Sequence, residues 1–389
     1  MSHKAENLRR AAAALAALVM MTTVKSFAAG VGSAASAPAT PAGQCRFMGI
    51  HRFEDFRVES ANGTNRILVS PVIKAPMAWN ELVVSWNGSA PTNSWLKAEA
   101  RAIYPGRQTK YYTLGLWSRE PSAAHPRESV RHQKDADGDV KIDTLVMREP
   151  GPDVQLRFTM GAENGGAAPE LRFVGLSFLD DRVRLDPLPS DHRAWGKVID
   201  TPEHSQHSYA EGGGWCSPTS LCMVLERWSR ILHRPEMKMD VPEIAASIND
   251  SSFGTGNWAF NMAFAGSFPG MRAYATRLSD LAEVEAWIQA GIPVVLSARW
   301  DLLSPGRKDT GNGHLVVCIG FTTNGDVIIN DPATNLAKGQ HVRHIYTRSN
   351  VINAWANSHN TVYLIYPQTT NPPANPYGHW DEPMVESKR

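Results

Sequence analysis

Residues 45–193 carry short apolar stretches that alternate with polar and turn-forming residues. β-Branched and aromatic side chains recur in the stretches, and Gly, Pro, Asn and Asp separate them, which is typical of strands. The predicted strands cover residues 66–72, 81–86, 98–104, 110–117, 140–146, 154–160 and 171–178. Strands at this spacing, with almost no helical periodicity, indicate an antiparallel β-sandwich or jelly roll.

The pattern changes after residues 185–189, a stretch that holds two prolines. From here on, helical and strand periodicities both occur. The predicted helices cover residues 217–228 and 281–290, and the predicted strands cover residues 293–298, 315–320 and 327–330. A helix that comes first and strands that follow it indicate an α+β domain.

The chain has 389 residues, which is more than one hydrophobic core ordinarily serves. We therefore expect two folded domains, a β-sandwich at 45–193 and an α+β domain at 194–367. The last residues, 368–389, are rich in Pro and Asn, and we expect an irregular tail there.

The N-terminal residues have the three-part layout of a secretory signal, in which basic residues precede an apolar run at 11–21 and small residues follow. A membrane-spanning helix needs about 20 apolar residues, so this run is too short to span a bilayer. We expect residues 1–29 to be a signal peptide and residues 30–44 to be a flexible leader. The mature chain would then be periplasmic or secreted, without stable membrane insertion; a retained N-terminal anchor is the alternative.

Charge and composition exclude several classes of partner. With 39 basic and 38 acidic residues, the formal net charge is +1, which gives no electrostatic footprint for nucleic acid. Four cysteines are few for an exported chain, so cores rather than disulfides should stabilise the fold. The histidines follow no recognisable zinc pattern, and the acidic stretch 135–139 lacks the glutamate of a calcium loop. We expect no metal and no cofactor.

A glycine-rich loop at 212–214 delivers Cys216 to the start of a predicted helix. Pro218 fits the first turn of that helix, where its missing N–H has no partner to lose. The positive end of a helix dipole favours a thiolate over a thiol, so the pKa of Cys216 should fall below its free value of about 8.5. This is the position of a nucleophile.

A thiolate that attacks a carbonyl group needs a partner that carries a proton to the leaving group, and histidine does this at neutral pH. His314 follows Gly313 directly and precedes the predicted strand 315–320. If that strand and the strand 327–330 form a hairpin, His314 comes to lie beside Asp331. Side chains alternate along a strand, so only one of Asn330 and Asp331 can face His314, and Asn330 is the alternative.

The stretches Gly-Trp-Cys-Ser-Pro-Thr-Ser, Gly-His-Leu-Val-Val and Asn-Asp-Pro together resemble the three catalytic blocks of the bacteriocin-processing-like cysteine peptidases, a family of papain-like fold. The resemblance covers about residues 199–367. It implies a Cys-His-Asp triad of Cys216, His314 and Asp331, and a glutamine upstream of the cysteine that donates to the oxyanion. Gln206 matches that glutamine, ten residues before Cys216, and Ser217 stands where the family commonly has glycine.

The resemblance implies an exported cysteine peptidase that acts on a peptide or protein through a thioester acyl-enzyme. One alternative is an acyltransferase or transpeptidase that uses the same fold and the same residues. The other is a non-catalytic envelope binding protein. The N-terminal β-domain is expected to recruit or position the substrate, and the sequence makes no prediction about oligomeric state.

Overall fold

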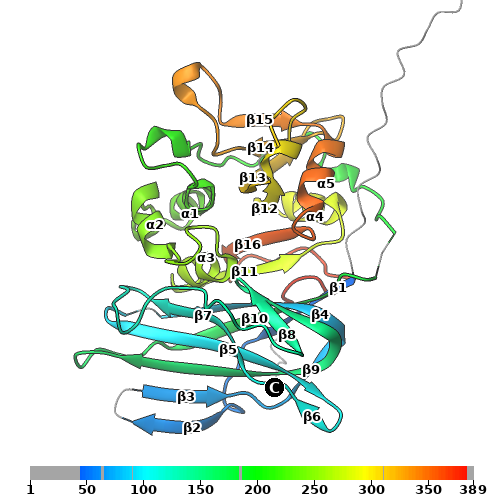
Figure 1. The fold of residues 1–389 in the computed structure, drawn as a ribbon. Helices are drawn as coiled ribbons and strands as arrows, with labels where there is room; N and C mark the ends of the chain where they lie inside the picture. Colours follow the sequence, from blue (N-terminus) through cyan, green and yellow to red (C-terminus); the bar gives the residue numbers. More distant parts are fainter. Residues whose placement is uncertain (1–43, 63–64, 90, 184–185, 310, 383–389) are drawn as a thin grey trace, which may run out of the picture. The chain divides into compact units, whose positions relative to one another are not determined.

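Ten antiparallel strands between Gln44 and Asp180 belong to one continuous sheet in the computed structural model (Figure 1). The model describes residues 44–62, 65–89, 91–183, 186–309 and 311–382. The strands are β1 (Gln44–Ile50), β2 (Arg57–Asn62), β3 (Asn65–Val69), β4 (Ile73–Gly88), β5 (Ser94–Tyr104), β6 (Arg107–Gln108), β7 (Tyr112–Ser118), β8 (Gly138–Lys141), β9 (Thr144–Ala162) and β10 (Leu171–Asp180). They make up the part of the chain in which the sequence predicts strands only.

Two long strands, β4 and β9, connect the parts of this sheet. The first residues of β9 pair with β8 and with the second half of β4, whereas its later residues pair with β3 and β5. Aromatic side chains fill the core of this part, among them the fully buried Trp79, Phe158, Phe173 and Phe178. One strand therefore belongs to both regions of the sheet and joins them covalently.

The prediction of a single strand at 140–146 is wrong. Strand β8 ends at Lys141 and β9 begins at Thr144, so Ile142 and Asp143 form a two-residue hairpin turn. The turn contains one usual turn residue, Asp143, but neither Gly, Pro nor Asn, and its first central residue is the β-branched Ile142, which favours strands. Ile142 instead adopts the left-handed conformation, with φ of 64°.

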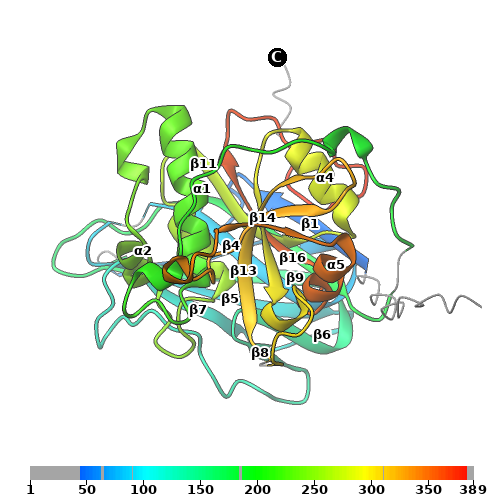
Figure 2. The same cartoon turned by 90° about the horizontal axis from the view of Figure 1, so that it is seen from above.

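The second part of the chain has a six-stranded sheet with the order β11-β16-β12-β13-β14-β15, and helices α1 and α2 lie on the opposite side of β13 and β14 from α4 and α5 (Figure 2). Its strands are β11 (Met271–Arg277), β12 (Val294–Arg299), β13 (Gly313–Phe321), β14 (Val327–Asn330), β15 (Arg343–Tyr346) and β16 (Thr361–Pro367). Its helices are α1 (Cys216–Leu232), α2 (Val241–Ile248), α3 (Trp258–Ala265), α4 (Leu281–Gln289) and α5 (Arg348–Ala356). The predicted hairpin is confirmed, because β13 and β14 pair in antiparallel register.

The outer edge of β11 is closed by side chains of β4 rather than by another strand. Strand β11 pairs with β16 on one side only. On its other side, the Asn87 side chain donates to the carbonyl of Ala273 at 2.6 Å and accepts from the N–H of Ala273 at 3.0 Å. Ser85, two residues earlier on β4, accepts from the N–H of Ala275 at 3.0 Å. The side chains of Ser85 and Asn87 on β4 therefore take the place of the backbone hydrogen bonds that a further strand would make with β11.

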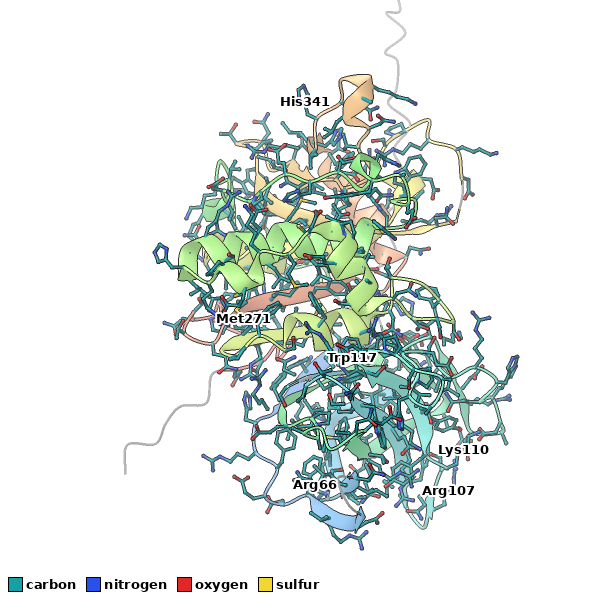
Figure 3. The ribbon with its side chains drawn as sticks, turned by 90° about the vertical axis from the view of Figure 1, so that its left-hand side faces the viewer. Arg66, Arg107, Lys110, Trp117, Met271 and His341 are labelled. Carbon is teal, nitrogen blue, oxygen red and sulfur yellow. The ribbon has the colours of Figure 1, made fainter. Side chains whose placement is uncertain are left out.

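Apolar contacts extend this junction. Figure 3 shows Trp117 between the strands of the first part and the helices of the second. Its ring lies 5.4 Å from the ring of Phe260 on α3, and Phe47 of β1 lies 4.4 Å from Tyr274 of β11. The contacts group residues 38–389 into one compact unit, and a single hydrophobic cluster runs through both parts.

The tail contains no helix or strand between residues 368 and 382, yet it is anchored. His379 is buried and lies 2.8 Å from Glu283 of α4, and the Trp380 ring packs 5.5 Å from Trp287. The predicted signal peptide and nearly all of the predicted leader lie outside the described residues. Among the helices that are described, none has the length and apolar character that crossing a membrane requires.

We predict that Asn87→Ala lowers the free energy of unfolding by about 2–4 kcal/mol, because it leaves the buried N–H and C=O of Ala273 without partners. Urea denaturation followed by fluorescence measures this change. Asn371→Ala, at an exposed position of the tail, is the control and should stay within about 0.5 kcal/mol of the unsubstituted protein. An Asn87→Ala variant as stable as this control would show that β4 does not hold the edge of β11.

Candidate active site

Cys216 is the first residue of α1, and a glycine loop delivers it there. Gly214 has φ of 88°, in the left-handed region, and a Cβ at Gly212 would lie 1.7 Å from the carbonyl oxygen of Gln206. Both positions therefore require glycine. The N-terminus of α1 has no side-chain cap, because the N-cap residue is Trp215, whose indole has no hydrogen-bond acceptor. Ser217, inside the first turn, donates to Asn261 of α3 at 2.8 Å. The half-buried thiol of Cys216 thus lies at an uncapped, positive helix end.

His314 and Asp331 meet as the predicted hairpin requires. His314 is the second residue of β13 and Asp331 follows β14 directly. The His314 Nε2 lies 2.7 Å from the Asp331 Oδ1, and both side chains are buried. Since Nε2 is bonded to the carboxylate, Nδ1 is the ring nitrogen that remains for Cys216.

Asn330 faces away from the histidine. Its Nδ2 donates to the carbonyl oxygens of Pro202 at 3.1 Å and Thr201 at 3.4 Å. Alternation along β14 therefore turns Asn330 toward the segment that precedes the glycine loop, and it is Asp331 that contacts His314.

Asp331 keeps its charge in a buried position because several groups surround it. Tyr346 donates to its Oδ2 at 2.6 Å, the N–H of Ala333 donates to its Oδ1 at 2.9 Å, and Arg307 lies 3.7 Å from Oδ2. Burial alone would raise the pKa of this carboxyl group, but the charge and hydrogen bond of His314 and the bond from Tyr346 hold it well below its usual range.

The pKa values of Cys216 and His314 shift in opposite directions. Burial opposes ionisation of the thiol, but a hydrogen bond from His314 and the charge of that residue outweigh it, so the pKa of Cys216 is lowered. Burial also disfavours the charged imidazole, yet Asp331 and Cys216 raise the pKa of His314 to about 10. The two groups together favour a thiolate beside an imidazolium.

The other three cysteines behave differently. Burial raises the pKa of Cys222 and of Cys318 to about 12, and it raises that of Cys45 further. All four thiols are free. Of these cysteines, Cys216 alone combines a lowered pKa with a position in a cavity.

Gln206 lines the same cavity as Cys216 and His314. It lies in a short 3₁₀ turn (Gln206–Ser208), is almost fully buried, and is tied by its N–H to the carbonyl of Pro332 at 2.9 Å. Its Oε1 has no hydrogen-bond partner among the described residues. Three of the four predicted site residues, Gln206, Cys216 and His314, therefore line one cavity, and Asp331 contacts His314 behind it.

This cavity has a volume of about 1090 Å³ and is lined by both parts of the chain. The second part contributes the residues around Cys216 and His314, and the first contributes the β8–β9 turn with Ile142 and Asp143. The β-strand part of the chain therefore lines the cavity directly.

Sequence reasoning missed the residues that support Asp331. Tyr346 belongs to β15, and Arg307 lies in the loop before β13, where its guanidinium donates to Tyr346 at 3.1 Å. Neither residue is part of a motif. Recognition of 343–346 as a strand paired with β14 would have been the one available signal for Tyr346.

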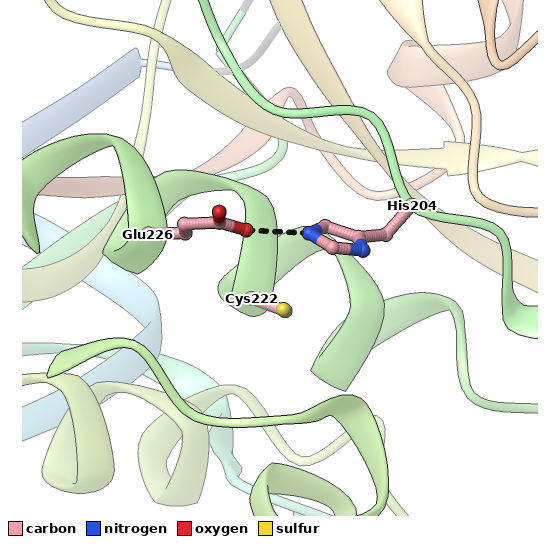
Figure 4. A group of neighbouring side chains, drawn as sticks. All are labelled: His204, Cys222 and Glu226. Carbon is pink, nitrogen blue, oxygen red and sulfur yellow. Dashed lines mark hydrogen bonds and ion pairs between the residues drawn. The ribbon is translucent and has the colours of Figure 1, made fainter. Parts of the chain in front are cut away.

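Two groups of potential metal ligands occur among the described residues. His204, Cys222 and Glu226 have ligand atoms within 4.8 Å of one another (Figure 4), and Glu81, Asp181 and His359 form a similar group. Cationic side chains already neutralise a carboxylate of each group: Arg230 and Lys238 contact Glu226, and Arg277 contacts Glu81. This positive charge weakens the attraction for a metal ion, so we assign neither group to a metal.

A thiol at a helix N-terminus, beside a buried imidazole that a carboxylate holds, is the arrangement of a cysteine peptidase site. Two family models agree with this class: the Peptidase C39 N-terminal domain matches residues 51–178, and the Peptidase_C39 like family matches residues 198–363. The chain belongs to the C39-like cysteine peptidase family, and a peptidase family implies peptide or protein substrates.

Comparison with solved structures gives a C39-like peptidase from Bacillus anthracis, which is 18% identical over 44% of this chain and 97% of that chain, with a TM-score of 0.33. At that TM-score the likeness carries no argument about this chain. No curated protein matches the sequence.

We predict that Asp331→Asn raises the pKa of Cys216 by at least about one unit, which is a tenfold loss of alkylation rate by iodoacetamide near pH 6. The substitution removes the negative charge that raises the pKa of His314, so less imidazolium is present to stabilise the thiolate. The pH profile of alkylation, followed by mass spectrometry, measures the shift.

Asn330→Ser is the matched control for this prediction, because Asn330 contacts the Thr201 and Pro202 carbonyls instead of His314. Its profile should keep the midpoint of the unsubstituted protein. Equal shifts in both variants would mean that general destabilisation, and not the charge of Asp331, controls the thiol.

Proposed function

We propose that this protein is an exported peptidase of papain-like fold that cleaves peptide bonds through Cys216, His314 and Asp331. In this proposal residues 194–367 form the catalytic domain and residues 45–193 form a β-sandwich domain that contributes to the substrate cavity. The observation that carries the proposal is that Cys216, at the uncapped start of α1, lines one cavity with His314, whose Nε2 lies 2.7 Å from the buried Asp331 carboxylate. The lowered pKa of the thiol and the raised pKa of the imidazole agree with this arrangement.

Each step of the proposed reaction uses a group at this site. The Cys216 thiolate attacks the carbonyl carbon of the scissile amide, and the carbon–nitrogen bond breaks as His314 protonates the leaving amine. A water molecule then attacks the thioester while His314 accepts its proton; the carbon–sulfur bond breaks, which releases the carboxylic acid and restores the Cys216 thiolate beside the His314 imidazolium. Asp331 orients His314 and stabilises its positive charge, since the 2.7 Å bond to Nε2 is present before substrate binds.

The oxyanion of the tetrahedral intermediate would be stabilised by the N–H of Cys216 and by the side-chain amide of Gln206. The uncapped start of α1 leaves the first amides of the helix available for a negative charge. The buried Gln206 side chain lines the same cavity as Cys216, which supports its assignment as the second oxyanion donor. One donor of this kind is worth about 3–4 kcal/mol in the transition state.

Two measurements test this function. The first is the rate of iodoacetamide labelling of Cys216 between pH 5 and pH 9, in the unsubstituted protein and in His314→Ala. Fast labelling of Cys216 below pH 7 that is lost in His314→Ala supports the thiolate–imidazolium pair. Labelling no faster than an ordinary thiol would exclude a catalytic cysteine and favour a binding protein.

The second measurement is the cleavage of a library of internally quenched peptides, followed by mass spectrometry of the products. Loss of all cleavage in Cys216→Ala is expected for a cysteine peptidase. Addition of free amines to the assay separates hydrolysis from acyl transfer, because a transferase joins the acyl group to the amine and the product is heavier by its mass.

We predict that Gln206→Ala lowers kcat/KM about 10²–10³-fold and leaves the iodoacetamide labelling rate of Cys216 unchanged. Gln206 acts on the oxyanion in this proposal and has no contact that would hold the thiolate. Gln108→Ala, at an exposed position on β6, is the control and should retain full activity. A loss of labelling that parallels the loss of cleavage would show that Gln206 supports the nucleophile instead of the oxyanion.

A further inference from the structure

Ile142, in the β8–β9 turn, combines backbone strain with an exposed apolar side chain. Its φ of 64° lies in the left-handed region, which a β-branched residue rarely adopts because its Cβ approaches the backbone too closely. Its side chain is nevertheless 37% exposed. The fold therefore carries two costs at this residue, one from the backbone and one from apolar surface left in water.

A glycine would satisfy the backbone at this position. In a two-residue hairpin turn, a positive φ at the first central residue is the feature for which glycine is usually selected. The Ile142 side chain is therefore not needed to form the turn. Strained residues that line a cavity are candidates for function, because the surrounding structure must hold them in place.

The turn is fixed against the peptidase part by the next residue. Asp143 is buried and accepts a hydrogen bond from the N–H of Trp258, the first residue of α3. The same helix carries Asn261, which accepts from Ser217 at 2.8 Å, directly beside the nucleophile. A short chain of contacts therefore links the position of Ile142 to the start of α1.

Other apolar side chains line the cavity near this turn. Phe253 is 48% exposed and lines the main cavity together with Ile142, and both also line a smaller cavity beside it. Trp215 and Trp258 are half-buried and line the main cavity too. The exposed apolar surface is thus continuous with the cavity that holds Cys216.

We propose that Ile142 and Phe253 form a hydrophobic subsite that binds a bulky apolar side chain of the peptide substrate. The β-strand part of the chain would then select the substrate that Cys216 cleaves. This inference rests on the proposed function, since it assumes that a peptide occupies the cavity.

Four cysteine-directed probes test the subsite without requiring turnover. Acetyl-Leu-Leu chloromethyl ketone carries its side chains on the acyl side of the reactive carbon, and bromoacetyl-Leu-Leu amide carries them on the other side. The Gly-Gly analogue of each probe is its reference. Second-order labelling rates of Cys216 are measured for the full chain, for Ile142→Ala, Ile142→Gly and Phe253→Ala, and for the control Val58→Ala. Val58 is β-branched and 54% exposed on β2, outside the cavity lining.

The expected result is that at least one leucine probe labels the unsubstituted protein about tenfold faster than its glycine analogue. This preference should fall below about threefold in the three subsite variants and persist in Val58→Ala. Labelling by iodoacetamide should be the same in all five proteins, because no subsite residue contacts the thiol. The inference is overturned if neither pair of probes shows a preference for leucine, or if the preference survives in the subsite variants.

Thermal unfolding tests the strain separately. Ile142→Gly should melt about 2–4 °C above Ile142→Ala, because glycine tolerates the left-handed conformation and alanine does not. The opposite order would show that the turn does not hold this conformation in solution, and it would overturn the argument from strain. Slow iodoacetamide labelling of the unsubstituted protein, together with a leucine preference that is lost in the subsite variants, would count against the catalytic proposal but not against the subsite.

Discussion

The edge of a β-sheet presents a row of N–H and C=O groups, and burying such an edge is costly unless those groups find partners. The six-stranded sheet solves this at β11, where Asn87 and Ser85 of β4 bond to the backbone of alternate residues. The remaining structure depends on this closure. It fixes β4 against β11, and because β4 pairs with β9, it also fixes the β8–β9 turn against the cavity.

The same principle of matched partners governs the site. A carboxylate as buried as Asp331 is costly unless hydrogen bonds and charges compensate it, and here Tyr346, Ala333, Arg307 and His314 surround it. These contacts are made before any substrate binds. The groups that hold His314 and stabilise a positive charge on its ring are therefore already in place in the folded protein.

Local patterns predicted much of the site. Glycines before Cys216, and a hairpin that joins His314 to Asp331, are features of adjacent residues, and periodicity located the flanking helix and strands. Arg307 and Tyr346, which contact Asp331, could not be predicted from the residues around them, because they approach Asp331 only when separate loops and strands come together. The turn at Ile142 was missed for another reason: a β-branched residue occupies the position where such turns favour glycine. The contribution of the first part to the cavity depends on the junction at β11, which has no local signal in the sequence.

Strand β16 (Thr361–Pro367) is the last strand among the described residues, yet it lies inside its sheet, between β11 and β12. During translation, β11 and β12 leave the ribosome without the strand that joins them. The buried tail residues His379 and Trp380 follow later still. The sheet that carries His314 is therefore incomplete until residues 361–367 have been made, and a chain shortened before Thr361 leaves the facing edges of β11 and β12 unpaired.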